Sequence, residues 1–68
     1  MEIQWESGFT ISVRQVSGEI VIEGNRAGLR SLANLLNQLA DMPEGAHVHL
    51  DEYNSLEEGS LPVIIDKI

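Results

Sequence analysis

The stretch over residues 25–41 constrains this chain more than any other, because it alone has a clean helical period. Its apolar residues recur at steps of three and four, the spacing of one face of an amphipathic helix. This stripe comprises Leu29, Leu32, Ala33, Leu36, Leu39 and Ala40, with Leu35 at its margin. The opposite, polar side holds Arg30, Ser31, Asn34, Asn37, Gln38 and Asp41. We therefore expect one helix whose stripe is covered by the β-rich segments before and after it.

Local signals place both ends of this helix. Asn25 is the expected N-cap, because its side-chain oxygen can accept hydrogen bonds from amides of the first turn. Gly28 weakens that first turn. Met42-Pro43 stops the helix, and Gly45 lets the chain reverse.

Four segments have the composition and alternation of strands. In the first, Phe9, Ile11 and Val13 alternate with polar residues, and Ser7-Gly8 predicts a bulge or bend. A tight turn at Ser17-Gly18 joins the first two strands into a hairpin. The expected strands span residues 3–16, 19–23, 46–52 and 61–68.

The element order β-β-α-β-β predicts an α+β domain with the helix on one face of a four-stranded antiparallel sheet. Strands two and four are apolar on both faces and suit the middle, which gives the spatial order 1-2-4-3. The rival order 1-2-3-4 needs a parallel pair and leaves the apolar fourth strand on an edge. At 68 residues, we expect one domain over residues 1–68.

The chain is strongly acidic, with 11 acidic against 4 basic residues and a net charge of −7. No Lys or Arg lies between Ser31 and Asp66. Nucleic acid and anionic membranes are poor partners for such a surface, whereas a cationic protein is a good one. The alternative is that the charge only keeps a small protein soluble. The first residues lack a basic run and no apolar run approaches the ~20 residues of a membrane span, so we expect a cytoplasmic protein.

A row of histidines and a carboxylate is the sharpest local pattern. His47, His49 and Asp51 alternate along a strand and therefore share one face. These groups can bind zinc, but a fourth ligand is not apparent and the chain has no cysteine. The other interpretation is a polar outer face whose histidines bond to neighbouring strands or to water. No nucleophile, phosphate-loop or dinucleotide motif accompanies the row, so we expect neither an enzyme nor a cofactor.

An acidic tract surrounds the third strand and the loop after it. It consists of Glu44, Asp51, Glu52, Glu57 and Glu58. Tyr53 lies among these acids, and tyrosine is a frequent interface anchor. Asn54 and Ser55 can hold a turn through side-chain-to-backbone bonds. The tract is either a partner-binding surface or a solvated loop. Trp5 is either a core residue, as its parity with Phe9 suggests, or an exposed anchor.

Two segments resemble a known family. One is Gly24-Asn25-Arg26-Ala27-Gly28-Leu29 with Ser31-Leu32-Ala33-Asn34, and the other is the run His-Val-His-Leu-Asp-Glu-Tyr-Asn-Ser-Leu-Glu-Glu-Gly-Ser over residues 47–60. Together, over residues 24–67, they are similar to the immunity protein family numbered thirty-two of bacterial polymorphic toxin systems. The resemblance implies an α+β protein made beside a toxin that it neutralises. Leu61-Pro62 departs from the expected strand, which would pair fully only after it.

The resemblance also implies a partner, the cognate protein toxin, with a nuclease as one candidate. The family's motif positions fall on His47, His49, Asp51, Asn54 and Glu57. The predicted partner-binding residues are His47, His49, Asp51, Glu52, Tyr53, Asn54, Glu57 and Glu58. An open sheet face and exposed edges would also allow a homodimer. A small metal- or ligand-binding module using His47, His49 and Asp51 is the alternative function.

Overall fold

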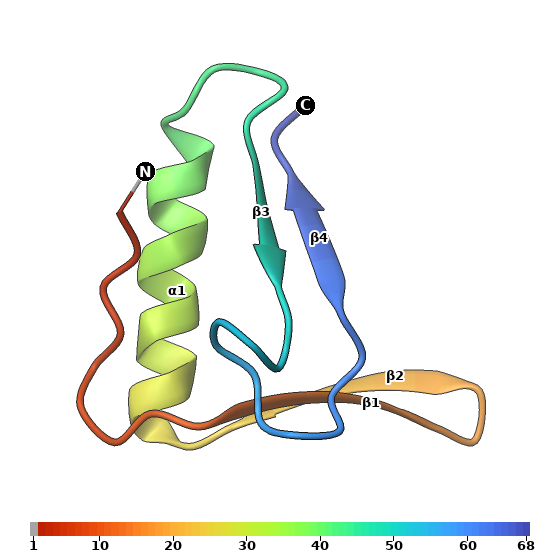
Figure 1. Cartoon of the computed structure of the whole chain (residues 1–68). Coiled ribbons are helices and arrows are strands. Elements are labelled where there is room, and N and C mark those ends of the chain that lie inside the picture. Colours follow the sequence, from red (N-terminus) through yellow and green to blue (C-terminus); the bar gives the residue numbers. More distant parts are fainter. Residues whose placement is uncertain (1) are drawn as a thin grey trace.

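The computed structural model describes residues 2–68 and has the predicted order β-β-α-β-β. Its elements are β1 (Ile11–Val16), β2 (Glu19–Gly24), α1 (Arg26–Ala40), β3 (His47–Leu50) and β4 (Val63–Asp66). The β1–β2 hairpin lies across one end of the molecule, and the β3–β4 hairpin stands beside the helix (Figure 1). The α+β class is therefore confirmed.

The predicted single sheet of order 1-2-4-3 is wrong, because the strands form two separate antiparallel pairs, β1–β2 and β3–β4. The prediction placed β4 against β2. Instead, the chain between β3 and β4 bonds to the opposite edge of the first hairpin. The Glu57 N–H donates to the Ile11 carbonyl at 2.8 Å, and the Leu61 N–H donates to the Val13 carbonyl at 2.8 Å. An irregular loop thus takes the place of a third strand beside β1, and β2 keeps a free edge.

The first hairpin has the tight turn expected from its sequence. Ser17 has φ 51° and Gly18 has φ 81°, and Val16 pairs with Glu19 around them. Two consecutive positive φ values are typical of the type I′ turn, whose twist matches that of the flanking strands. This turn fixes the register of the whole hairpin.

The N-terminal segment is not a strand, so the prediction for residues 3–16 is correct only from Ile11 onward. The Phe9 N–H donates to the Glu6 carbonyl at 3.1 Å, which closes a turn where a bulge or bend was expected. The rings of Trp5 and Phe9 stack with centroids 4.7 Å apart, and both pack against the core. The core interpretation of Trp5 is therefore confirmed.

Asn25 caps the helix as predicted and also fastens the N-terminal segment to it. Its Oδ1 accepts from the Gly28 N–H at 2.8 Å and from the Thr10 N–H at 3.0 Å. Its Nδ2 donates to the Gly8 carbonyl at 2.9 Å. At the other end, Asp41 is the C-cap, just before Pro43. One side chain therefore fixes both the helix start and the path of the chain beside it.

The helix buries a different face from the predicted stripe, rotated by about one residue. The buried residues of α1 are Gly28, Ser31, Leu35 and Leu39. Leu29 and Leu36, expected in the stripe, are 51% and 43% exposed. Ser31, expected on the polar side, accepts from the Glu6 N–H at 2.8 Å and donates to the Ala27 carbonyl at 2.7 Å. Small residues face the backbone of the N-terminal segment, and a periodicity of large apolar residues does not detect them.

The core forms where α1, β1 and the second hairpin meet. It consists of Ile11, Val13, Leu35, Leu39, Val48, Leu50 and Leu56. β4 begins immediately after Pro62, as the missing donor of that proline predicted. Over residues 2–68, no helix is long and apolar enough to cross a membrane.

Candidate functional site

His47 and His49 lie on the outer face of the β3–β4 hairpin, as predicted. Val48 and Leu50 between and beyond them are buried on the inner face. The two imidazole rings meet edge-on, with centroids 5.1 Å apart. The Nδ1 of His47 lies 3.2 Å from the Gly45 carbonyl oxygen. The two histidines therefore form an exposed pair on β3, and the following loop begins directly after this strand.

Asp51 serves the loop rather than the histidine row. Its Oδ1 accepts from the backbone N–H groups of Tyr53 at 2.9 Å and Asn54 at 3.1 Å. In return, Asn54 Oδ1 accepts from the Asp51 N–H at 3.0 Å, and its Nδ2 donates to the His49 carbonyl at 2.8 Å. These reciprocal side-chain bonds reinforce a backbone turn, in which the Asp51 carbonyl accepts from the Ser55 N–H at 3.0 Å and the Leu56 N–H at 2.8 Å. They also engage Asp51 Oδ1, one of the oxygens that a metal ion would need.

Residues 2–68 contain no group of three or more His, Asp or Glu residues placed to hold a metal ion. The same part of the chain contains no pocket. A cofactor or small ligand would usually need a concave site with converging polar groups. The described residues offer no concave site of this kind around the histidines.

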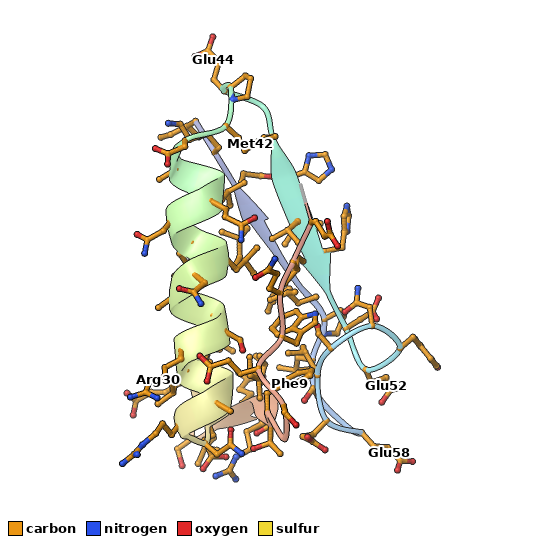
Figure 2. The ribbon with its side chains drawn as sticks, turned by 90° about the vertical axis from the view of Figure 1, so that its left-hand side faces the viewer. Phe9, Arg30, Met42, Glu44, Glu52 and Glu58 are labelled. Carbon is orange, nitrogen blue, oxygen red and sulfur yellow. The ribbon has the colours of Figure 1, made fainter. Side chains whose placement is uncertain are left out.

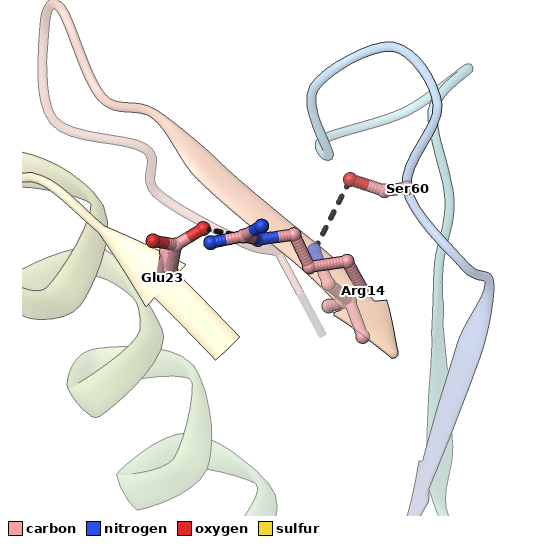
Figure 3. Close-up of polar contacts among 4 residues, drawn as sticks. Arg14, Glu23 and Ser60 are labelled. Carbon is pink, nitrogen blue, oxygen red and sulfur yellow. Dashed lines mark hydrogen bonds and ion pairs between the residues drawn. The ribbon is translucent and has the colours of Figure 1, made fainter. Parts of the chain in front are cut away.

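We call residues 51–60 the acidic loop, and several contacts hold it in place. Glu52 Oε2 accepts from the Gly59 N–H at 2.8 Å, which joins its two ends. The Leu56 side chain is buried in the core. The Ser60 Oγ accepts from the Val13 N–H of β1 at 3.1 Å (Figure 3). The acidic loop is thus tied to itself, to the core and to β1.

The acidic loop presents an aromatic residue and several carboxylates to solvent. Tyr53 is 90% exposed, and Glu57 and Glu58 are also exposed. Figure 2 shows Glu52 and Glu58 on one side of the molecule, whereas Glu44 lies at the opposite end. Glu44, which was expected in the acidic tract, therefore lies apart from the other acidic residues.

Arg14 pairs with a carboxylate outside the acidic loop. The Nε of Arg14 lies 2.7 Å from Oε1 of Glu23 on the first hairpin (Figure 3). This hydrogen bond, helped by the opposite charges, lowers the pKa of Glu23 and raises the pKa of Arg14. Arg30 projects on the helix side in Figure 2, away from Glu52 and Glu58. Within the described residues, no ion pair neutralises the carboxylates of the acidic loop.

Sequence reasoning missed the residues that position the loop. Ser60 and Leu56 were not singled out, although each makes a contact that fixes the loop on the core. Asp51 and Asn54 were assigned to the partner, whereas their hydrogen bonds shape the turn. The signal was available in the Asp-x-x-Asn spacing, because both residue types bond readily to nearby backbone groups. Only the turn-holding role given to Asn54 anticipated this.

Replacing His47 and His49 together with glutamine should leave folding intact. Both rings are exposed, and substitutions at such positions usually change stability by about 0.5 kcal/mol or less. Thermal unfolding followed by circular dichroism tests this. Leu50→Ala, in the same strand but facing the core, is the contrasting variant and should cost about 2–5 kcal/mol. A double histidine variant that no longer unfolds cooperatively would make the pair structural.

Comparison with known proteins places these features in a family. The family model described as immunity protein 32 matches residues 19–68, from β2 through the acidic loop to the end of the chain. No curated protein and no solved structure matches. The matched range contains both segments that carry the resemblance, residues 24–34 and 47–60. Because it spans well over half of the 68 residues, the chain belongs to the immunity protein 32 family.

Proposed function

We propose that this chain neutralises a cognate bacterial toxin by covering a cationic surface of the toxin with β3 and the acidic loop. The family is one of immunity proteins, which implies a toxin as the partner. The contacting residues would be His47 and His49 on β3, with Glu52, Tyr53, Glu57 and Glu58 on the acidic loop. Asp51 and Asn54 would shape the loop from within it.

Charge supports this choice of surface. A toxin that acts on nucleic acid must present positive charge to its substrate. Carboxylates facing that charge raise the association rate and penalise wrong partners. The chain carries a net charge of −7, with no Lys or Arg between Ser31 and Asp66. An intracellular nuclease is therefore the toxin class that best fits the proposed surface.

The observation that carries the proposal is the fixed acidic loop with Tyr53 exposed within it. Tyr53 is 90% exposed, while Leu56 three residues later is 4% exposed. A loop that is already ordered loses little conformational entropy when a partner binds. Tyrosine can supply a large apolar contact, and surrounding charges then orient the encounter. Inhibition would follow from occlusion of the toxin's site, without chemistry by this chain.

Reversing the two exposed glutamates, Glu57→Lys with Glu58→Lys, should weaken toxin binding by roughly tenfold, mainly through a slower association rate. Stopped-flow or surface-plasmon measurements at several salt concentrations test this. The wild-type association rate should fall as salt rises, because exposed charges are screened. Asp41→Lys with Glu44→Lys changes the net charge equally at the other end of the molecule and is the matched control. Equal weakening by both double variants would assign the effect to net charge rather than to the acidic loop.

Growth rescue tests the function itself. The toxin encoded beside this chain's gene is expressed with and without the chain, in a host that the toxin arrests. Rescue by the wild type, with binding of the purified proteins, is the expected result. A folded chain that neither binds that toxin nor restores growth would end the immunity proposal.

A further inference from the structure

β2 has an open edge, which follows from the pairing of the first hairpin. Val13 directs its backbone groups away from β2, since it bonds to Leu61 and Ser60 on the far side of β1. In an antiparallel pair, opposed residues either both bond inward or both face outward. Ile22 is opposite Val13, and Ile20 is two residues away on the same strand. The backbone N–H and C=O groups of both isoleucines therefore point out from the free edge of β2.

An uncovered apolar surface adjoins this edge. Ile20 and Ile22 are 59% and 53% exposed. They share the hairpin face of Gly24, where a Cβ would lie 3.3 Å from the Leu29 side chain of α1. Leu36 lies two turns further along the helix and is also exposed. We call Ile20, Ile22, Leu29 and Leu36 the β2 corner; it lies on the side of α1 away from Ser31 and the N-terminal segment.

The edge of β1 is covered, whereas the edge of β2 is open. The acidic loop donates hydrogen bonds to the edge of β1. On β3, the His49 carbonyl accepts a hydrogen bond from the Asn54 side chain. Natural edge strands are usually protected by lysine, proline, a bulge or a covering segment. β2 has the sequence Glu-Ile-Val-Ile-Glu-Gly and a regular register, without lysine, proline or a bulge. Its charges, Glu19 and Glu23, lie on the face opposite to that of the two isoleucines.

A second copy of the chain is a poor occupant of this edge. Antiparallel pairing of β2 with itself, with Ile20 opposite Ile22, places Glu19 opposite Glu23 twice. Like charges directly opposite each other destabilise a pair of strands. Each copy also carries a net charge of −7. A cationic protein has neither disadvantage, since its net charge is opposite and its basic side chains would face Glu19, while Glu23 is paired with Arg14.

We infer that the free edge of β2 binds an extended segment of the toxin, which adds a third strand to the β1–β2 hairpin. This inference rests on the proposed function and names a second contact for the same partner. Backbone hydrogen bonds to Ile20 and Ile22 hold the added strand, as in other strand-addition complexes. Its apolar side chains pack on the β2 corner, and its basic side chains on the other face meet Glu19. The toxin would then contact the chain on both sides of the first hairpin, at the free edge of β2 and at the acidic loop beside β1.

The test uses Ile20→Lys with Ile22→Lys, which places charge on the apolar face of the edge. Binding of the purified, catalytically inactivated product of the adjacent toxin gene should weaken by roughly 30-fold or more, the loss expected of a strong interface residue. Asn34→Lys with Asn37→Lys adds two lysines at exposed positions of α1, outside the β2 edge. This control should change affinity by less than about threefold, since substitutions outside the contact have little effect.

Hydrogen exchange provides a readout that needs no variant. In the free protein, the amides of Ile20 and Ile22 should exchange quickly, whereas those of Val21 and Glu23 are protected by bonds to β1. Addition of the toxin should slow exchange at Ile20 and Ile22 specifically. Their continued fast exchange in a formed complex would overturn the inference and leave the proposed function standing.

The remaining outcomes are also decisive. Absence of wild-type binding would overturn the proposed function and, with it, the strand addition. A wild-type dimer in light scattering that the Ile20→Lys with Ile22→Lys variant abolishes would assign the edge to a second copy instead. A monomer that binds the toxin, with slowed exchange at the two isoleucine amides, supports the inference.

Discussion

Replacement of Leu35 with alanine is expected to lower the free energy of unfolding by about 2–5 kcal/mol, the cost of a large-to-small change in a core. Leu35 is 0% exposed and lies at the centre of the buried face of α1. Domains are stable by only about 5–15 kcal/mol, and short chains bury the least surface. The variant should therefore lose most of its cooperative unfolding transition. Thermal and urea denaturation followed by circular dichroism measure this directly.

Leu36→Ala is the matched control, because it removes the same atoms from the next residue of the same helix. Leu36 is 43% exposed and belongs to the β2 corner. Its truncation should cost about 1 kcal/mol or less, since no buried cavity is created. Equal losses in the two variants would mean that the helix buries the stripe predicted from periodicity rather than the face described above.

The comparison of these two leucines shows which information the sequence carried. The ends of α1 were predictable, because Asn25 and Pro43 act locally through a side-chain cap and a missing donor. The rotation of α1 was not, because it depends on what packs against it. Gly28 and Ser31 are buried by the backbone of Glu6 and Thr10. Hydrophobic periodicity counts large side chains and gives no weight to small residues that allow a close approach.

The prediction of a single four-stranded sheet was wrong for a related reason. The strands themselves follow from local alternation and from the turn at Ser17-Gly18. Their association depends on which edge the chain between β3 and β4 reaches. Glu57 and Leu61 bond to β1, and nothing in the pattern of those two residues indicates that they donate to that strand. The apolar sequence of β2 argued for a central strand, whereas β2 lies at an edge with Ile20 and Ile22 exposed.

For the candidate site, the sequence showed which residue types are present. The structure separates the residues that shape the loop from those that face solvent. The alternation of residues 47–50 was sufficient to place both histidines on the outer face. It was not sufficient to separate Asp51 and Asn54, which hold the acidic loop, from Tyr53 and Glu58, which face solvent. That division depends on hydrogen-bond partners, such as the Tyr53 and Asn54 amides for Asp51. Sequence spacing suggests such bonds but does not assign them.

Replacement of Gly28 with alanine gives a prediction in which helix propensity and tertiary packing have opposite signs. Alanine in place of glycine within a helix ordinarily stabilises by about 1 kcal/mol. Here the added Cβ would overlap the Thr10 carbonyl oxygen and would lie 2.9 Å from Cγ1 of Ile11. Neither neighbour can move freely, because Ile11 is buried and Thr10 accepts from the Asn25 N–H at 3.2 Å. Packing should win, and Gly28→Ala should destabilise by about 1–3 kcal/mol, the range for overfilled sites.

Ala33→Gly measures the propensity term by itself, because Ala33 is exposed on the same helix. That control should cost about 1 kcal/mol through backbone entropy alone. In a domain of this size, each 1 kcal/mol changes the melting temperature by roughly 4–8 °C, so both effects are measurable. The strain of Gly28→Ala falls on the contact between α1 and the segment before β1, so tryptophan fluorescence of Trp5 should change in that variant and not in Ala33→Gly. A melting temperature raised by Gly28→Ala would show that Thr10 does not approach the helix as closely as described, and that the N-terminal segment is free to give way.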